Sequence, residues 1–380
     1  MTLAIKRKIS WFASISFGIL LLLMPPGALS AFTGREHIYW IYVFALAFCA
    51  ASALVPLAET AAGKLGAIDM PDFRKVHTVP MPRLGGLAIY LAVMLALWRG
   101  HAMTGQTLAI VAASSLIFFM GVADDCRGLS ATLRLVIQLA AACIIVNSGL
   151  TFNSFQWLPA GQFISAMVTV VWLVGVTNAF NFLDGIDGLA SGLGTVCAIF
   201  FMGIGWHTHQ LQMSLLAAAL AGACCGFLPA NWSPARMFLG DSGSTFIGFV
   251  LASLAVYGGW ATNNPAVAIS TPLLILGVPI FDIIYITISR IKNGQVRNLK
   301  EWIEYVGKDH FHHRLLHLGL TVPTAAAFII LVNIILGLGA WTMHYTATAF
   351  GTILLLMQSV LILCIIAFLM LVGRDIKSSK

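Results

Sequence analysis

The chain alternates between long apolar segments and short polar ones, and this pattern predicts a membrane protein made of helices. A helix that crosses the hydrocarbon core needs about 20 mostly apolar residues. The predicted spans lie near 10–31, 38–59, 84–99, 107–123, 132–149, 163–179, 188–205, 212–229, 243–259, 267–289, 324–342 and 346–372. With 59% hydrophobic and 9% charged residues, the composition excludes an ordinary soluble domain. We therefore expect an all-α, polytopic integral membrane protein with about 11–12 transmembrane helices in a single domain over 1–380.

The first span has two interpretations. Lys6, Arg7 and Lys8 precede a short apolar core, and ALSA follows at residues 28–31, as in a cleaved secretory signal. The same residues also suit a retained extra helix, which we favour. Either interpretation places residue 32 outside the membrane.

The charged residues lie almost entirely in loops that are predicted on one side of the membrane. If the basic N-terminus stays in the cytoplasm, only Arg35 and Arg99 of the 21 Lys and Arg residues, and only Glu36 of the 14 acidic residues, fall outside. The positive-inside rule explains the basic bias but not the acidic one. A polar site at the cytoplasmic surface explains both. Its expected walls are the inner loops near 60–83, 124–131, 178–188, 230–242 and 290–322.

The segment NAFNFLDGIDG places Asn178, Asn181, Asp184 and Asp187 directly after an apolar run. Their spacing of three residues would put them on one face of a helix. Carboxylates in the membrane usually line a functional or hydrated cavity. An ordinary polar loop near the interface is the simpler alternative.

Two further segments contain acidic residues that are candidates for the polar site. Asp124 and Asp125 end the span that begins near 107, where adjacent carboxylates need a shared cation or proton unless they are solvated. Asp241 lies in FLGDSGSTFIG, whose small residues permit close approach and whose helix start attracts phosphate. Helix capping alone would also explain an Asp there.

Basic residues complete the pattern. His310, His312 and His313 lie in KDHFHHRLLHLGL, where flanking cations favour phosphate contact over a zinc site, with a surface role as the remaining alternative. Lys75 and His77 lie in the stiff basic segment PDFRKVHTVPMPRLGG.

Two isolated charges have open interpretations. Arg134 is a candidate for diphosphate recognition, with snorkelling to the interface as the alternative. Asp282 in VPIFDIIYI suits either a structural partnership or a catalytic part. The seven cysteines show no metal or disulfide spacing.

Carboxylates and amides that suit magnesium, together with basic loops, indicate phosphoryl transfer on a nucleotide diphosphate. The sequence lacks GxxxxGK[ST] and a GxGxxG that follows a strand, which argues against an ATP-driven pump of the usual design. An enzyme that acts on a lipid phosphate fits better. The net charge of +7 suits anionic lipids or an anionic substrate.

The ordered segments FRKVHTVPMPRLGG, GVADDCRGLSATLRLVIQL, NAFNFLDGIDGLASG, FLGDSGSTFIGF, PIFD and HFHHRLLHLGL resemble the polyprenyl-phosphate N-acetylhexosamine-1-phosphate transferases. The similarity covers about 38–340 and is greatest to the bacterial undecaprenyl-phosphate N-acetylglucosaminyl-1-phosphate branch. It implies a UDP-N-acetylhexosamine donor, an undecaprenyl phosphate acceptor, Mg²⁺ or Mn²⁺, and a location in the bacterial inner membrane with a cytoplasmic active site. No nucleic acid partner is expected, and a homodimer is compatible with the resemblance.

The resemblance also implies residue roles. Asp241 and Asn181 are expected to hold the metal and Asp187 to meet the uracil. Asp124 and Asp125 are expected to orient or activate the lipid phosphate, with Asp241 as the third catalytic carboxylate. The substrate-binding residues expected are Lys75, His77, Arg134, Asn178, Asp184, Asp187, His310, His312 and His313. Relatives often carry Lys at the position of Arg134 and a third acid soon after the Asp pair, where this chain has CRGL.

Three functions stay open at this stage. The preferred one transfers GlcNAc 1-phosphate and starts a cell-surface polysaccharide such as the O-antigen of lipopolysaccharide. The second, within the same superfamily, uses UDP-N-acetylmuramoyl-pentapeptide and starts peptidoglycan. The third is a cation-coupled transporter, because intramembrane Asp and Asn also form ion sites.

Overall fold

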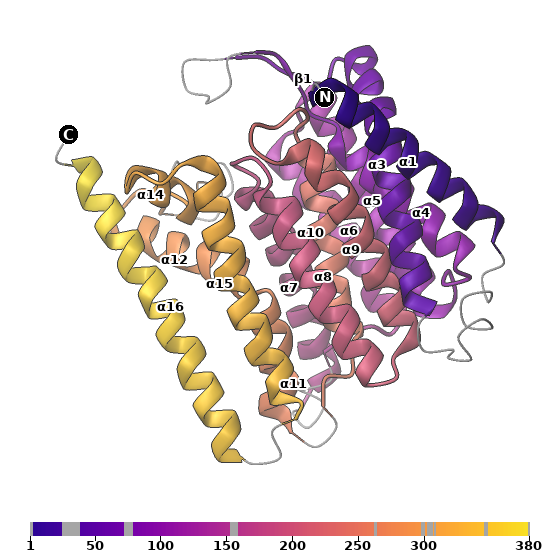
Figure 1. Ribbon diagram of the computed structural model, residues 1–380. Coiled ribbons are helices and arrows are strands. Elements are labelled where there is room, and N and C mark those ends of the chain that lie inside the picture. Colours follow the sequence, from indigo (N-terminus) through magenta and orange to yellow (C-terminus); the bar gives the residue numbers. More distant parts are fainter. Residues whose placement is uncertain are drawn as a thin grey trace.

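The described part of the chain folds into a bundle of helices with a short pair of antiparallel strands, called the hairpin below (Figure 1). The computed structural model describes residues 3–24, 39–71, 79–152, 159–261, 264–297, 301, 307, 309–345 and 349–378. The helices are α1 (Leu3–Leu23), α3 (Tyr39–Leu65), α4 (Gly85–Arg99), α5 (Gly105–Arg127), α6 (Ala131–Asn147), α7 (Gly161–Leu183), α8 (Leu189–His207), α9 (Leu211–Asn231), α10 (Gly240–Tyr257), α11 (Pro265–Ile275), α12 (Gly277–Lys292), α14 (Phe311–His317), α15 (Val322–Met343) and α16 (Ala349–Ser378). Strands β1 (Ile68–Asp69) and β2 (Met81–Pro82) pair antiparallel.

The prediction of an all-α, polytopic membrane protein is confirmed. Among the described residues, seven helices are long and apolar enough to cross a membrane, and a bent helix pair makes an eighth candidate. Shorter apolar helices lie at 13–23, 85–99 and 131–147. Every one of the twelve predicted spans overlaps a helix, so the alternation of apolar and polar segments located the elements well.

The predicted span at 267–289 is broken rather than continuous. Helices α11 and α12 meet at an angle of 83°. Pro272 lies inside α11 and Gly277 begins α12, and both residue types weaken a continuous helix. The buried amide of Asn333 on α15 donates to the Ile275 carbonyl at 3.1 Å and accepts from the Val278 N–H at 3.4 Å. It therefore satisfies backbone groups on both sides of the break.

Helix α10 is the centre of the bundle. Apart from Asp241, its residues from Gly240 to Val256 are buried, and it packs against α4, α5, α7 and α8. A helix that is buried on all faces lies in the interior rather than against lipid. This packing brings the first turn of α10, with Asp241, to the last turns of α5, with Asp124 and Asp125.

The polar loops gather at one end of the bundle. The start of α1 and the end of α16 lie at this end, together with the hairpin and α14, whereas α11 lies at the other (Figure 1). The predicted topology of twelve spans would also put the two ends of the chain on one side. The candidate site occupies this end.

Candidate active site

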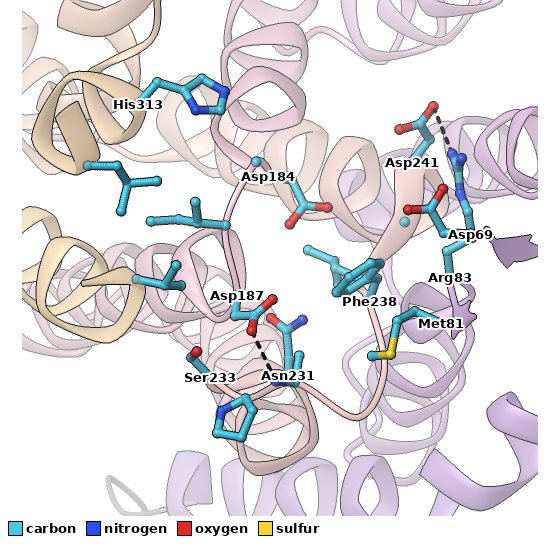
Figure 2. A pocket seen from close by; sticks show the side chains of 18 of the residues that line it. Asp69, Met81, Arg83, Asp184, Asp187, Asn231, Ser233, Phe238, Asp241 and His313 are labelled. Atoms are coloured by element: carbon cyan, nitrogen blue, oxygen red, sulfur yellow. Dashed lines mark hydrogen bonds and ion pairs between the residues drawn. The ribbon is translucent and has the colours of Figure 1, made fainter. Parts of the chain in front are cut away.

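A cavity of about 760 Å³ opens between the loops at the polar end (Figure 2). Its lining comes from four segments that are far apart in the sequence. The lining residues are Asp69, Val79, Met81 and Arg83; Asp184, Gly185, Ile186 and Asp187; Asn231, Ser233, Pro234, Ala235, Phe238, Leu239, Gly240 and Asp241; and His313, Leu316, His317 and Val322. Four of the five predicted inner loops thus form its wall.

Four of the predicted site residues line this cavity directly: Asp184, Asp187, Asp241 and His313. Figure 2 shows Asp184 and Asp187 on the turn after α7, and Asp241 across from them beside Arg83. The cavity therefore joins acidic groups from three segments with a guanidinium and two imidazoles. Such a mixture suits an anionic ligand that binds together with a cation.

Asp125 joins α5 to the first turn of α10. Its Oδ1 accepts from the backbone N–H of Asp241 at 2.9 Å, and its Oδ2 accepts from that of Ser242 at 3.0 Å. Gly240 has φ +76°, and a Cβ atom there would lie 2.7 Å from Asp125 Oδ2, so glycine is needed at this junction. The carboxylate thus satisfies the free N–H groups of the helix start and fixes Asp241 relative to α5.

Two arginines bracket Asp241. Arg83 donates from Nε and Nη2 to Asp125 Oδ1 at 3.1 and 3.0 Å, and its Nη2 lies 3.8 Å from Asp241 Oδ2. Arg134 pairs through Nη1 with Asp124 Oδ2 at 2.9 Å and lies 3.7 Å from Asp241 Oδ2. Arg134 on α6 therefore reaches the carboxylate cluster, and Asp124 and Asp125 bring the fifth predicted loop, near 124–131, to the site. Three carboxylates and two guanidinium groups make a nearly balanced cluster, which reduces the repulsion between the acids.

The oxygen groups next to α10 suit a hard cation. Asn181 Oδ1 accepts from Ser244 Oγ at 2.6 Å, which holds this amide against the same helix that carries Asp241. Within the described ranges, no three His, Cys, Asp or Glu side chains form a preassembled metal cluster. Magnesium commonly takes only one or two carboxylates from the protein and completes its shell with water and substrate phosphate. The oxygen donors Asp241 and Asn181 fit that chemistry.

Asp187 supports the segment between α9 and α10. Its Oδ2 accepts from the backbone N–H of Ala235 at 3.0 Å. Asn231 donates to the Met237 carbonyl at 3.0 Å. The backbone of Phe238 donates to the Pro82 carbonyl in β2 and accepts from the Gly85 N–H at the start of α4. These contacts hold the cavity wall, and one carboxylate oxygen of Asp187 is engaged in this way.

Asp184 lies in the cavity wall and is half-buried. Burial, together with the negative charges of Asp241 and Asp125, raises the pKa of its carboxyl well above the usual value. The structure thus places Asp184 where a cationic ligand or a proton would relieve unfavourable charge.

The three predicted histidines lie in different surroundings. His313 lines the cavity. His312 is 1% exposed and packs against the turn after α7, where a Cβ atom on Gly185 would lie 2.3 Å from its Nε2. Burial and the neighbouring His313 and His310 lower the pKa of His312 well below its usual value, so its ring is neutral. His310 is bonded to Asp282.

Asn178 is not among the residues that line the cavity. Asn178 donates to Gln138 Oε1 and to the Val174 carbonyl, both at 2.8 Å, so its amide joins α7 to α6. Lys75 and His77 lie outside the described residues.

Sequence reasoning missed several residues of the cavity as site residues. Arg83 was noted only as part of a basic segment, and Asp69, Asn231 and Phe238 were not selected. The position of Arg83 two residues before the paired glycines that begin α4 was a usable signal, because a cation at a tight helix start has little freedom. Phe238 carried no signal, since one Phe among many apolar residues is not distinctive.

The chain is similar to known lipid-linked sugar transferases. The model of Glycosyl transferase family 4 matches residues 107–259. A probable undecaprenyl-phosphate N-acetylglucosaminyl 1-phosphate transferase of Bacillus subtilis (strain 168) is 36% identical over 296 residues, 76% of this chain and 80% of the relative. A decaprenyl-phosphate N-acetylglucosaminephosphotransferase of Mycobacterium tuberculosis (strain ATCC 25618 / H37Rv) is 33% identical, covering 68% of this chain and 71% of the relative. An undecaprenyl-phosphate alpha-N-acetylglucosaminyl 1-phosphate transferase of Escherichia coli (strain K12) is 27% identical, covering 73% and 77%. The chain thus belongs to the polyprenyl-phosphate N-acetylhexosamine-1-phosphate transferase family, glycosyl transferase family 4, and to its bacterial branch.

Proposed function

We propose that this protein transfers N-acetylglucosamine 1-phosphate from UDP-N-acetylglucosamine to undecaprenyl phosphate, with UMP as the second product. The cavity at the polar end carries the proposal, because it joins carboxylates, a guanidinium and an imidazole next to the α10 start. The names of the three relatives all contain N-acetylglucosamine and a polyprenyl phosphate, which supports this donor and acceptor. The pentapeptide-specific and transporter alternatives are not favoured by these relatives.

The reaction joins two anions. A phosphate oxygen of the lipid attacks the β-phosphorus of the donor, and the bond from that phosphorus to the oxygen bridging to the α-phosphate breaks. The electron pair of that bond leaves with UMP. A phosphate monoester has its second pKa at about 6 and is largely ionised at neutral pH. A strong general base is therefore unnecessary, and the protein must chiefly orient the phosphates and offset their charge.

The hydrogen bonds of Asp124 and Asp125 agree with a role in orientation rather than in proton transfer. Both oxygens of Asp125 accept hydrogen bonds from the chain, and Asp124 accepts from the Leu129 N–H and pairs with Arg134. We assign both carboxylates to orientation of Arg83, Arg134 and the α10 start. The two guanidinium groups would contact substrate phosphate, which guanidinium binds in two-point geometry.

Asp241 and Asn181 are the groups we assign to Mg²⁺, with Mn²⁺ as a substitute. When bound, the ion supplies positive charge to the diphosphate and orients it. We assign Asp187 to the uracil side of the cavity and Asp184 and His313 to the donor.

The cytoplasm supplies UDP-sugars, so we place the polar end at the cytoplasmic face of the bacterial inner membrane. The product would begin a cell-surface polysaccharide such as O-antigen.

The decisive experiment supplies purified protein in lipid nanodiscs with undecaprenyl phosphate, Mg²⁺ and one of several radiolabelled UDP-sugars. We expect UMP release and a labelled lipid diphosphate sugar with UDP-N-acetylglucosamine. A lipid product formed only from UDP-N-acetylmuramoyl-pentapeptide would instead establish the peptidoglycan activity. Solute flux in proteoliposomes without UMP release would establish transport and contradict the proposal.

A further inference from the structure

Asp282 is a buried carboxylate on α12 with two partners in the histidine segment. It is 1% exposed. Its Oδ1 accepts from the Phe311 backbone N–H at 2.8 Å, and its Oδ2 lies 2.8 Å from His310 Nδ1. A buried carboxylate is costly unless it is paired and hydrogen-bonded. Both oxygens are engaged with the start of α14, so Asp282 anchors that helix to α12.

A second contact holds the same segment to α12. Arg290, whose side chain is 4% exposed, donates to both carboxylate oxygens of Asp309 at 2.9 and 2.7 Å. Burial alone would raise the pKa of Asp309, but the hydrogen bonds and charge of Arg290 lower it below the usual value. Residues 309–311 are thus fixed to α12 by two charge-assisted links, and only the Asp282 link involves an imidazole.

The Asp282 contact selects one form of the His310 ring. A carboxylate only accepts hydrogen bonds, so the hydrogen between the two groups belongs to Nδ1. The Nε2 atom is then the one that is open to another partner. The ring also lies 5.5 Å from that of Phe182 and 5.9 Å from that of His312, measured between centroids.

A chain of contacts connects this ring to the cavity. The His312 ring lies 4.2 Å from that of His313, which lines the cavity. His312 also packs against Gly185, between the carboxylates of the turn after α7. A change at His310 is therefore transmitted to two sides of the cavity through packed groups.

We propose that Asp282 is a positioning residue for donor binding: it fixes the Nδ1–H tautomer of His310 and the start of α14, and thereby sets His313 in the cavity wall. This proposal rests on the proposed function, because it takes the cavity to be the donor site. Asp282 itself does not line the cavity.

The variant Asp282→Asn separates the two contacts. Its amide oxygen can still accept from the Phe311 N–H, but its NH₂ group must donate to His310 Nδ1, which requires the other tautomer. We expect the KM for UDP-N-acetylglucosamine to rise by about tenfold or more, as for other residues that orient a ligand-binding His, with a smaller change in kcat. Asp309→Asn is the matched control, since it removes the neighbouring link without altering the acceptor for His310. An unchanged KM in Asp282→Asn would overturn the proposal.

A tautomer measurement tests the same point without turnover. In protein labelled with ¹⁵N-histidine, the His310 signal is assigned by its loss in His310→Gln. We expect Nδ1–H in the wild type and in Asp309→Asn, and Nε2–H in Asp282→Asn. An Nε2–H tautomer in the wild type would contradict the proposal. If UDP-sugars give no turnover at all, the proposed function fails while this measurement still stands.

A double-mutant cycle shows whether Asp282 acts through His310. If it does, Asp282→Asn has no further effect on KM in a His310→Gln background. Additive effects of the two substitutions would show that Asp282 acts through another group, and the proposal would be wrong.

Discussion

Asp241 lies 3.8 Å from the guanidinium of Arg83 and 3.7 Å from that of Arg134, while Asp125 holds its backbone N–H. Among the predicted site residues that the structure describes, no other contacts so many charged groups of the cluster. Its negative charge is therefore the feature that the surrounding residues are arranged to balance. An amide of the same size would keep the shape of the site and lose this charge.

We accordingly expect Asp241→Asn to lower metal-dependent UMP release by about 100-fold or more, the scale seen when one group that stabilises developing charge is lost. The protein should still insert and purify, because the backbone contacts of residue 241 remain. Ser253→Ala on the same helix is the control and should retain activity, since the Ser253 hydroxyl donates to the Phe249 carbonyl within α10. Normal turnover in Asp241→Asn would remove this residue from the proposed metal site.

Arg83 gives a second test at this scale. Arg83→Gln removes the cation shared by Asp125 and Asp241, so we expect a loss of about 10- to 100-fold in kcat/KM for the donor, as for the loss of a charge-assisted pair worth about 1.5–3 kcal/mol. Arg83→Lys should recover little, because an ammonium does not reproduce the two-atom contact. Arg127→Gln, an exposed cation at the end of α5, serves as the matched control. Equal activity of the Gln and wild-type proteins would show that Arg83 only supports the fold.

Asp184 should make the stability of the protein depend on pH. Because folding raises the pKa of this carboxyl, the charged form lowers the stability of the folded protein. The loss of stability is full at pH above the folded-state pKa and vanishes at pH below the unfolded-state pKa, which is about 3.9. Asp184→Asn imitates the protonated form. In buffer without divalent cations we expect this variant to be more stable than wild type at neutral pH and equally stable near pH 4. Thermal unfolding across that range measures the difference, and a variant less stable at neutral pH would contradict this sign.

The sequence could identify these acids but not their partners. Asp124, Asp125 and Asp241 stand out because carboxylates are rare in an apolar chain, and burying them needs a reason. By contrast, Asn178 is equally polar but has a structural role. Its amide forms a hydrogen bond with Gln138, because one neighbouring helix can supply the partner that an amide needs. Side-chain polarity therefore located the site, while the division between ligand-facing and structural groups required the packing.

Among the elements, the break between α11 and α12 could not be predicted from hydropathy, because both halves are apolar. Pro272 and Gly277 mark a weak point, but the angle of 83° depends on what satisfies the backbone there. Asn333 provides that contact from α15, which lies far along the chain. The bend matters for the site because α12 carries Asp282 and Arg290.

This explanation predicts a stability effect for Asn333. Asn333→Leu leaves the Ile275 carbonyl and the Val278 N–H without their side-chain partner. We expect a loss of about 1–3 kcal/mol in the free energy of unfolding, the usual cost of a buried unsatisfied group. The exposed Asn293→Ala at the end of α12 should change it by less than about 0.5 kcal/mol. Denaturant unfolding in detergent compares the two, and equal stabilities would show that water or a backbone shift satisfies the break.

At the scale of the whole molecule, the charge asymmetry along the sequence anticipated how distant loops assemble. Loops placed on one side by alternating spans supply Arg83, Asp184, Asp241 and His313 to one cavity. This works because a membrane confines loops to two surfaces, so that topology alone brings distant polar segments together. The charge asymmetry does not, however, predict how deeply a residue is buried. His312 and Asp282 are buried behind the cavity.

The first helix joins this assembly through specific contacts. Tyr42 donates to the Leu21 carbonyl at 3.0 Å, Arg99 donates to the carbonyls of Leu22 and Met24 at 3.2 and 2.6 Å, and Trp11 donates to the Ala53 carbonyl at 3.2 Å. The last carbonyls of a helix lack partners within it and carry partial negative charge. Arg99 and Tyr42 satisfy them, and removal of α1 would leave a buried tyrosine and an arginine without these acceptors.

We therefore expect α1 to be retained in the mature protein rather than cleaved after the ALSA segment. Intact mass and N-terminal sequencing of protein purified from membranes should show a chain that still contains residues 3–23. Arg99→Leu should loosen α1 and make its last turns more accessible to protease added at the end of the bundle opposite the cavity, while Arg127→Gln should not. A mature chain that begins directly after residue 31 would show that these contacts are made only before processing, and the bundle would then function with eleven of the twelve spans predicted from the sequence.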